Sequence, residues 1–196
     1  DQKQKTVVLV RLFELVNADR RLSDQRMAII KTVGEVFNIS PQEYRSIENF
    51  VIRDEISDLD DESILIINDD DNTFTFSKHI KSEALNGNIL LLRVKSTELY
   101  FLRYTGKQDL FLNGLGVYNN RIYLFATGST LKLPKGKPVY FSDVVSNFLS
   151  DITVTKLSFN VKNVSYRFPT GNLGLHDISF TTAQGKLIGI MGASGA

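Results

Sequence analysis

Residues 186–196 read KLIGIMGASGA, and this stretch decides how we interpret the C-terminal part of the chain. Its apolar run over residues 186–191 predicts a buried strand, which leads directly into a loop of glycine, alanine and serine. Backbone N–H groups of such a loop can converge on phosphate oxygens, because no large side chain blocks the approach. Small residues also gather in ordinary turns, so the loop alone leaves both interpretations open.

The spacing of these small residues fits the phosphate-binding P-loop pattern G-x-x-x-x-G-K-[ST], which follows a strand and precedes a helix. Gly192 takes the first position, and the next four are taken by Ala193, Ser194, Gly195 and Ala196. The second glycine of the pattern would fall one position after Ala196. Because the sequence stops inside the pattern and starts at Asp1 without a methionine, we interpret it as a piece of a longer protein.

Three segments occur in an order that strengthens the phosphate interpretation: LSFNVKNVSYRF at residues 157–168, LHDISF at 175–180 and GKLIGIMG at 185–192. Over residues 156–196 this order resembles the opening of the nucleotide-binding domain of ATP-binding cassette (ABC) transporters. In that family a strand ending near an aromatic residue leads to an L-x-x-[VI]-S-F strand, a glycine turn and the strand before the P-loop. The run IMGxSGA is further similar to export-type half-transporters.

This resemblance implies that the longer protein binds ATP and Mg²⁺ and couples ATP hydrolysis to transport across a membrane. Tyr166 matches the family's aromatic residue that stacks on the adenine ring; a strand aromatic packed in a core is the alternative. The phosphates would be held by residues 192–196. A transmembrane domain and a second nucleotide-binding domain are the implied partners, and the cytoplasmic side of the cell membrane is the implied location.

The P-loop lysine, the Ser or Thr that binds Mg²⁺, the acidic Mg²⁺ site, the base and the signature loop of the family would all follow Ala196. The resemblance therefore assigns no catalytic or metal-binding residue to this chain. We expect residues 1–196 alone to be a soluble regulatory or interaction region that neither binds ATP appreciably nor hydrolyses it. We also expect the uncovered strands of residues 156–196 to pair with those of a second copy.

A second hypothesis is a non-enzymatic protein–protein interaction module, in which the C-terminal strands complete a β fold and bind no nucleotide. The two hypotheses differ in the residues that follow Ala196. A continuation with Gly-Lys-Ser or Gly-Lys-Thr favours the ATPase, and any other continuation favours the interaction module.

Residues 7–53 have the apolar spacing of three short amphipathic helices, which predicts a small helical bundle. Ser23 is positioned to cap the second helix, and Ser40-Pro41-Gln42-Glu43 forms a capping box that starts the third. Asn38 stands where a left-handed helix end is tolerated. Residues 15–23 and 37–43 resemble the tellurite-resistance (TerB-like) helical fold. Asp19 matches that family's acidic position, but Arg26 replaces its glutamate, so we expect Asp19 to cap or pair locally.

Residues 63–150 change to a period of two and predict short strands at 64–67, 73–76, 88–94, 98–104, 109–112, 121–126 and 130–133. Turn residues such as Asn113-Gly114 separate them, which favours an antiparallel sandwich or small barrel. A helix over 142–149, capped by Ser142, would lead out of this region. Residues 110–114 and 128–131 are similar to the second half of the forkhead-associated sandwich, although the Gly-Arg and Ser-x-x-His residues that grip phosphothreonine in that family have no counterpart.

We expect the remaining charged and titratable residues to lie on the protein surface and not to form a catalytic or metal site. Residues 54–62 are rich in carboxylates, which favours an extended, solvated linker; calcium binding is the alternative, but the spacing is not that of an EF-hand. We expect both histidines, His79 and His176, to be exposed. Lys132, Lys135 and Lys137 flank prolines, and we expect them to lie in a solvated loop.

The composition of the 196 residues excludes several classes of protein. A net charge of +1 gives no field to attract nucleic acid, and the absence of cysteine excludes disulfides and thiolate sites. No apolar run approaches the roughly 20 residues of a membrane span. The sequence thus predicts an α+β protein of three parts: a helical bundle at 1–55, an antiparallel β domain at 63–150, and the first strands of an ABC-type P-loop ATPase at 155–196.

Overall fold

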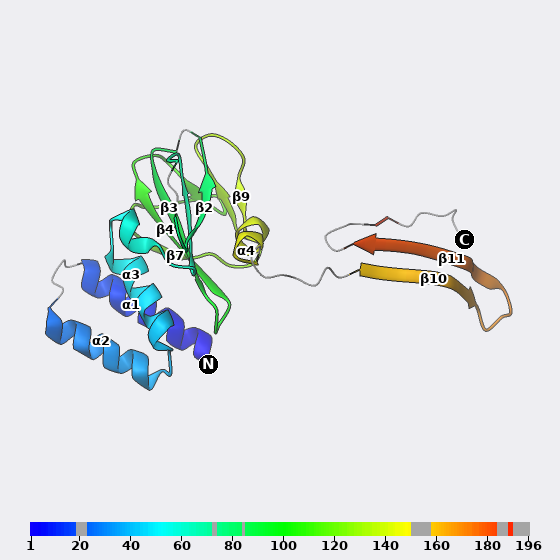
Figure 1. Cartoon of the computed structure of the whole chain (residues 1–196), viewed down its shortest axis with the longest axis horizontal. Helices are drawn as coiled ribbons and strands as arrows, with labels where there is room; N and C mark the ends of the chain where they lie inside the picture. The colour runs from blue at the N-terminus through cyan, green and yellow to red at the C-terminus, as the bar shows by residue number, and fades with distance from the viewer. Residues whose placement is uncertain (19–22, 72–73, 84, 150–157, 184–187, 190–196) are drawn as a thin grey trace. The chain divides into compact units, whose positions relative to one another are not determined.

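The chain forms an α+β fold made of two compact units, residues 1–150 and residues 151–196 (Figure 1). The computed structural model describes residues 1–196 except 19–22, 72–73, 84, 150–157, 184–187 and 190–196. Asp19 and the loop 192–196, both singled out from the sequence, lie outside the described residues.

Three helices open the first unit: α1 (Gln2–Ala18), α2 (Asp24–Val36) and α3 (Pro41–Ile52). The predicted caps are confirmed. The Ser23 hydroxyl accepts a hydrogen bond from the backbone N–H of Arg26, and the Ser40 hydroxyl accepts one from the N–H of Glu43. Asn38 adopts a φ of 53° between α2 and α3, as its tolerance of the left-handed region predicted.

A five-stranded sheet lies beside these helices in the order β2-β1-β3-β4-β7. Its strands are β1 (Ile64–Asn68), β2 (Lys78–Lys81), β3 (Gly87–Val94), β4 (Leu99–Gly106) and β7 (Ile122–Leu124). The β1–β2 pair is parallel and the other pairs are antiparallel, so the sheet is mixed where we predicted a purely antiparallel one. Parallel pairing is reached because residues 69–77 carry the chain from the end of β1 back to the start of β2.

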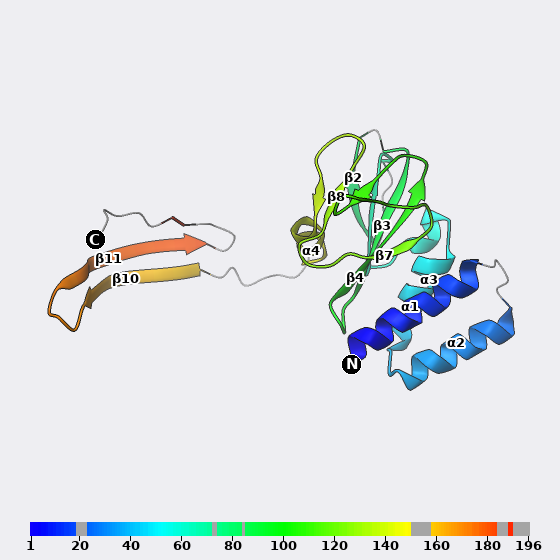
Figure 2. The ribbon, with the colours of Figure 1, turned by 180° about the vertical axis from the view of Figure 1, so that it is seen from behind.

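The helices and the sheet share one core, so the predicted regions 1–55 and 63–150 form a single unit instead of two. One face of the sheet packs against α1 and α3, while α2 packs against α1, and Figure 1 and Figure 2 both place the helices on that side. The connection over residues 54–62 is correspondingly not the extended linker that we predicted. It contains a short 3-10 helix, η1 (Ile56–Leu59), whose Leu59 is fully buried in the shared core.

The opposite face of the sheet packs against a four-stranded antiparallel sheet in the order β6-β5-β8-β9 and against α4. These elements are β5 (Phe111–Leu112), β6 (Leu115–Gly116), β8 (Thr130–Lys132), β9 (Val139–Tyr140) and α4 (Phe141–Leu149). The described strands close no barrel, so of the two predicted alternatives the paired sheets are present. Because both faces of the five-stranded sheet are covered, every residue of β1 is buried.

Several local predictions need correction. Residues 74–76, part of a predicted strand, are not in a strand, whereas β2 was not predicted. Ser142 lies inside α4, and the carboxylate of Asp143 accepts the N–H of Tyr140 at the start of that helix instead. The Asn113-Gly114 turn is confirmed: both residues have positive φ, and they join β5 to β6.

The second unit is a two-stranded antiparallel ribbon of β10 (Ser158–Arg167) and β11 (Leu173–Ala183), which overlap the segments 157–168 and 175–180 where the resemblance predicted strands. Of the strand predicted over 186–191, only residues 188 and 189 are described, and they are not in a strand. The register of the ribbon shifts at three places: between Val161 and Val164, between Val164 and Tyr166, and between Tyr166 and Arg167. These shifts mark β-bulges.

Candidate functional site

Tyr166 is the one predicted site residue that the structure describes, and it lies near the end of β10. Half of its surface, 50%, is exposed, and it is paired across the ribbon with Leu175. Within this unit the ring is thus not buried in a core, and a flat π surface is accessible for stacking.

Phe168 is a further aromatic residue of this site, to which sequence reasoning gave no role. Its ring centroid lies 5.1 Å from that of Tyr166, and the two ring planes stand at 82°. This edge-to-face arrangement is one of the two that aromatic pairs favour. The signal in the sequence was the alternation Tyr166-Arg167-Phe168, which places both rings on one face of an extended strand.

The ribbon gathers its large apolar side chains on one face. Cross-strand partners share a face, and the register pairs Val161 with Phe180, Val164 with Ile178 and Tyr166 with Leu175. The positions change from odd (159, 161) to even (164, 166) along β10, which in a regular strand would put them on opposite faces. The bulges restore the phase, so one apolar face runs along the ribbon from Phe159 to Tyr166, whereas Leu173 pairs with Arg167 after the third register shift.

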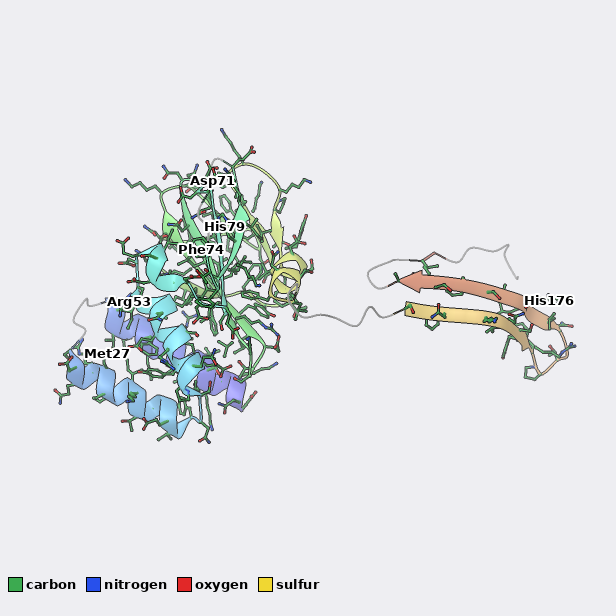
Figure 3. All side chains as sticks on the ribbon, in the orientation of Figure 1. Met27, Arg53, Asp71, Phe74, His79 and His176 are labelled. Atoms are coloured by element: carbon green, nitrogen blue, oxygen red, sulfur yellow. The ribbon has the colours of Figure 1, made fainter. Side chains whose placement is uncertain are left out.

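The bulges at Asn163 and Asp177 have matching construction. Asn163 in β10 and Asp177 in β11 both adopt positive φ, 53° and 46°. The N–H of Asn163 donates to the hydroxyl of Ser179, and the N–H of Asp177 donates to the hydroxyl of Ser165. Each bulge thus receives a serine acceptor from the opposite strand. His176, next to the second bulge, is exposed as predicted (Figure 3).

His79 does not lie exposed, which corrects our prediction. It is half-buried on β2, its ring packs against Phe74 at 5.5 Å, and Nε2 lies 2.8 Å from Oδ1 of the buried Asn68 (Figure 3). Asn68 in turn donates from Nδ2 to Oδ1 of Asn88 on β3. The histidine is therefore held in a polar chain across the sheet, because its ring at a parallel edge strand faces the side chains of β1.

The carboxylates of the predicted linker serve the fold. Asp60 accepts hydrogen bonds from the backbone N–H groups of Thr75, Phe76 and Ser77, and Asp61 accepts one from the hydroxyl of Ser46. Burial acts to raise the pKa of Asp60, but the hydrogen bonds from Ser77, Phe76 and Thr75 lower it to about 2. Among the described residues, no three His, Asp or Glu side chains gather closely enough to hold a metal ion.

A groove of about 570 Å³ lies between α2 and α3, with Tyr44 among its lining residues. The Tyr44 ring packs edge-on against Phe13, and α2 comes close to it at Gly34, where a Cβ atom would lie 2.7 Å from the ring. Burial, followed by the charges of Glu48 and Glu35, raises the pKa of Tyr44 to about 12. The phenol therefore stays protonated, and the groove offers apolar contact rather than a nucleophile.

The remaining predictions concern three lysines and the turn at Asn113. The three lysines at positions 132, 135 and 137 are exposed, as predicted, but Lys132 is the last residue of β8 and does not lie in a loop. The side chain of Asn113 closes its own turn, with Oδ1 accepting the N–H of Thr130 at 2.9 Å. None of the helices in the described ranges has the length and apolar character needed to cross a lipid bilayer.

Comparison of the chain with models of protein families, with curated protein sequences and with solved structures gave no match.

Proposed function

We propose that residues 156–196 are the leading strands of an ABC-type nucleotide-binding domain, in a protein that couples ATP hydrolysis to transport across a membrane. The observation that carries the proposal is the half-exposed ring of Tyr166, on a ribbon that precedes the small-residue loop at residues 192–196. An aromatic ring accessible at this place can stack on a nucleotide base. Such stacking contributes on the order of 1–3 kcal/mol per base.

The residues present fit ATP in two ways. The Tyr166 ring offers a π surface to the adenine, and its Phe168 neighbour leaves that ring half-exposed. The backbone N–H groups of residues 192–196 would take the phosphates, since glycine, alanine and serine leave the approach open. ATP would supply the phosphoryl group whose transfer drives the transport cycle, with Mg²⁺ held by residues of the longer protein.

The apolar face of the ribbon supports the same proposal. Its exposed members include Phe159, Val164, Leu175 and Ile178, and a two-stranded ribbon is marginal in water without a covering layer. We propose that the rest of the nucleotide-binding domain supplies this layer in the longer protein. There the partners would be a transmembrane domain and a second nucleotide-binding domain, on the cytoplasmic side of the membrane.

In this proposal residues 1–150 are a regulatory or docking region. We also propose that its helices have a TerB-like fold and that its strands have a forkhead-associated fold. The groove between α2 and α3, lined by apolar residues such as Met27 and Ile39 and by charged residues, is a surface that such a region could present to another domain.

The alternative function is a non-enzymatic interaction module that uses the apolar face of the ribbon directly. The observation that favours it is the same exposure of Phe159, Val164 and Ile178, which would suit a protein partner equally well. The two functions predict different residues after the loop at 192–196, because the binding of a protein partner does not require a lysine there.

The deciding experiment reads the codons that follow Ala196 and then assays the protein made from the complete reading frame. We expect Gly-Lys-Ser or Gly-Lys-Thr next, and Mg²⁺-dependent ATPase activity that is lost when that lysine becomes alanine. A different continuation, or a complete protein without nucleotide binding, overturns the proposal and leaves the interaction module.

A further inference from the structure

The Tyr166 ring has a neighbour whose own position is tightly determined. Phe168 directly follows the end of β10, two residues after Tyr166, and the two ring planes are nearly perpendicular with their centroids 5.1 Å apart. Three features of the chain fix Phe168: its backbone, the turn that follows it and the residue beneath its ring.

The backbone of Phe168 is fixed by the hairpin turn between β10 and β11. Its N–H donates to the carbonyl of Asn172, and its carbonyl accepts the N–H of Gly171, both at 2.8 Å. Pro169 follows directly and restricts the chain at the second position of the turn. Gly171 takes a φ of 92°, which a residue without a Cβ adopts at little cost.

The ring of Phe168 lies over a gap that only glycine provides. A Cβ atom on Gly174 would stand 2.5 Å from Cε2 of Phe168 and 3.1 Å from its Cζ. Every other residue type would therefore push the ring out of its place. Because β11 has no side chain at Gly174, the Phe168 ring can pack directly on the strand and contact the Tyr166 ring.

We infer that Phe168, seated over Gly174, is a positioning residue that holds the Tyr166 ring in the orientation needed to stack on a purine base. This inference rests on the proposed function. A half-exposed tyrosine without such a neighbour would exchange between rotamers, and binding of the base would then carry the entropic cost of ordering the side chain. An edge-to-face neighbour fixes it beforehand, which favours binding of the base and leaves the phosphate contacts untouched.

The experiment measures affinities of the protein made from the complete reading frame for ATP and for inorganic tripolyphosphate, each with Mg²⁺. Phe168→Leu should weaken ATP binding about threefold to tenfold, the range that aromatic pairs contribute. Tripolyphosphate has no base, so its affinity should not change. Phe168→Tyr keeps an aromatic ring at the same place and should retain the affinity for ATP.

Two results would overturn the inference. One is unchanged ATP affinity in Phe168→Leu while Tyr166→Ala weakens it, which leaves the proposed function standing and removes only the positioning role. The other is an equal loss for ATP and tripolyphosphate, which would show general damage to the domain. If the unaltered protein binds neither ligand, the proposed function fails and the inference fails with it.

A readout without nucleotide tests the geometry separately on residues 1–196. The ring current of Phe168 should displace the NMR signals of the Tyr166 ring protons in the unaltered chain, and Phe168→Leu should return them toward free-tyrosine values. Gly174→Ala should do the same, because its methyl group displaces the Phe168 ring. Tyr166 signals that neither variant moves would contradict the positioning geometry, whatever the ATP measurements give.

Discussion

Arg103 on β4 donates from Nη1 to the carbonyl oxygen of Val51, at 3.0 Å, in the last turn of α3. Its Nη2 donates to the carbonyl of Arg53, the residue that ends the helix, and its guanidinium lies over the ring of Phe50 at 5.9 Å. Only 2% of the arginine is exposed. A cation at a helix C-terminus complements the partial negative charge there, so this residue ties the helical layer to the sheet.

Replacing this arginine should therefore weaken the whole first unit. We expect Arg103→Met to lower the free energy of unfolding by about 2–3 kcal/mol, because two carbonyl groups lose a charged donor. Urea unfolding followed by circular dichroism measures it. The matched control is Arg121→Met, an exposed arginine, which should change stability by less than about 0.5 kcal/mol. Equal stability of the two variants would contradict the role given to Arg103.

The Asp60 carboxylate should make stability depend on pH. Its folded pKa of about 2 lies below the model-peptide value of 3.8, so its contribution is complete above about pH 4 and is lost as the pH falls toward 2. Because the group is partly solvated, we expect a contribution of about 1 kcal/mol.

The comparison uses Asp60→Asn, with Asp58→Asn at an exposed position as the control. At pH 6 urea unfolding should show Asp60→Asn less stable than the unaltered chain by that amount, and the difference should shrink between pH 4 and pH 2. Asp58→Asn should follow the unaltered chain throughout. A difference that stays constant down to pH 2 would show that the charge of Asp60 is not what matters.

The apolar face of the ribbon should make residues 1–196 associate through residues 156–196. Light scattering should then give a mass above that of one chain, and Ile178→Lys should reduce it, since a lysine on the apolar face opposes burial of that face. Thr181→Lys, on a residue paired with Asn160 on the opposite face, is the control and should leave the mass unchanged. A chain that is monomeric at high concentration, with an ordered ribbon, would argue against this association.

Residues 1–196 alone should not bind ATP appreciably, because the P-loop pattern requires a lysine to reach the phosphates and residues 192–196 include none. Isothermal titration of ATP and Mg²⁺ into this chain should give no measurable heat of binding at micromolar concentrations. A micromolar affinity would show that the lysine is dispensable or that the nucleotide binds elsewhere.

The sequence predicted those parts of the fold that depend on local chemistry. The capping box at Ser40 and the Asn113-Gly114 turn fix their own backbone within a few residues, so both could be predicted without knowing what packs around them. The β10 and β11 strands were also predicted, because their apolar and aromatic residues are frequent.

Features that depend on distant partners could not be predicted in this way. β2 has the mixed pattern Lys-His-Ile-Lys and becomes a strand only by parallel pairing with β1. Residues 75 and 76 alternate like a strand, yet their N–H groups donate to Asp60. The sequence around Arg103 predicts only a strand arginine, because its contact with a carbonyl of α3 depends on how the helix packs against the sheet.

At the candidate site, Tyr166 was predicted and Phe168 was not. The aromatic role of Tyr166 came with the resemblance, whereas the seat of Phe168 over Gly174 requires the register of the two strands. The bulges at Asn163 and Asp177 had a signal in the sequence, the change of apolar positions from odd to even, which periodicity alone does not distinguish from two short strands.

The central claim is that the Tyr166 ring and the small-residue loop belong to one nucleotide site, and the affinity for ATP of the protein made from the complete reading frame tests it most directly. The account expects calorimetry to give binding that weakens about fivefold or more in Tyr166→Ala, as the loss of a stacked base requires. No binding by the unaltered protein, or an affinity that Tyr166→Ala leaves the same, would contradict it.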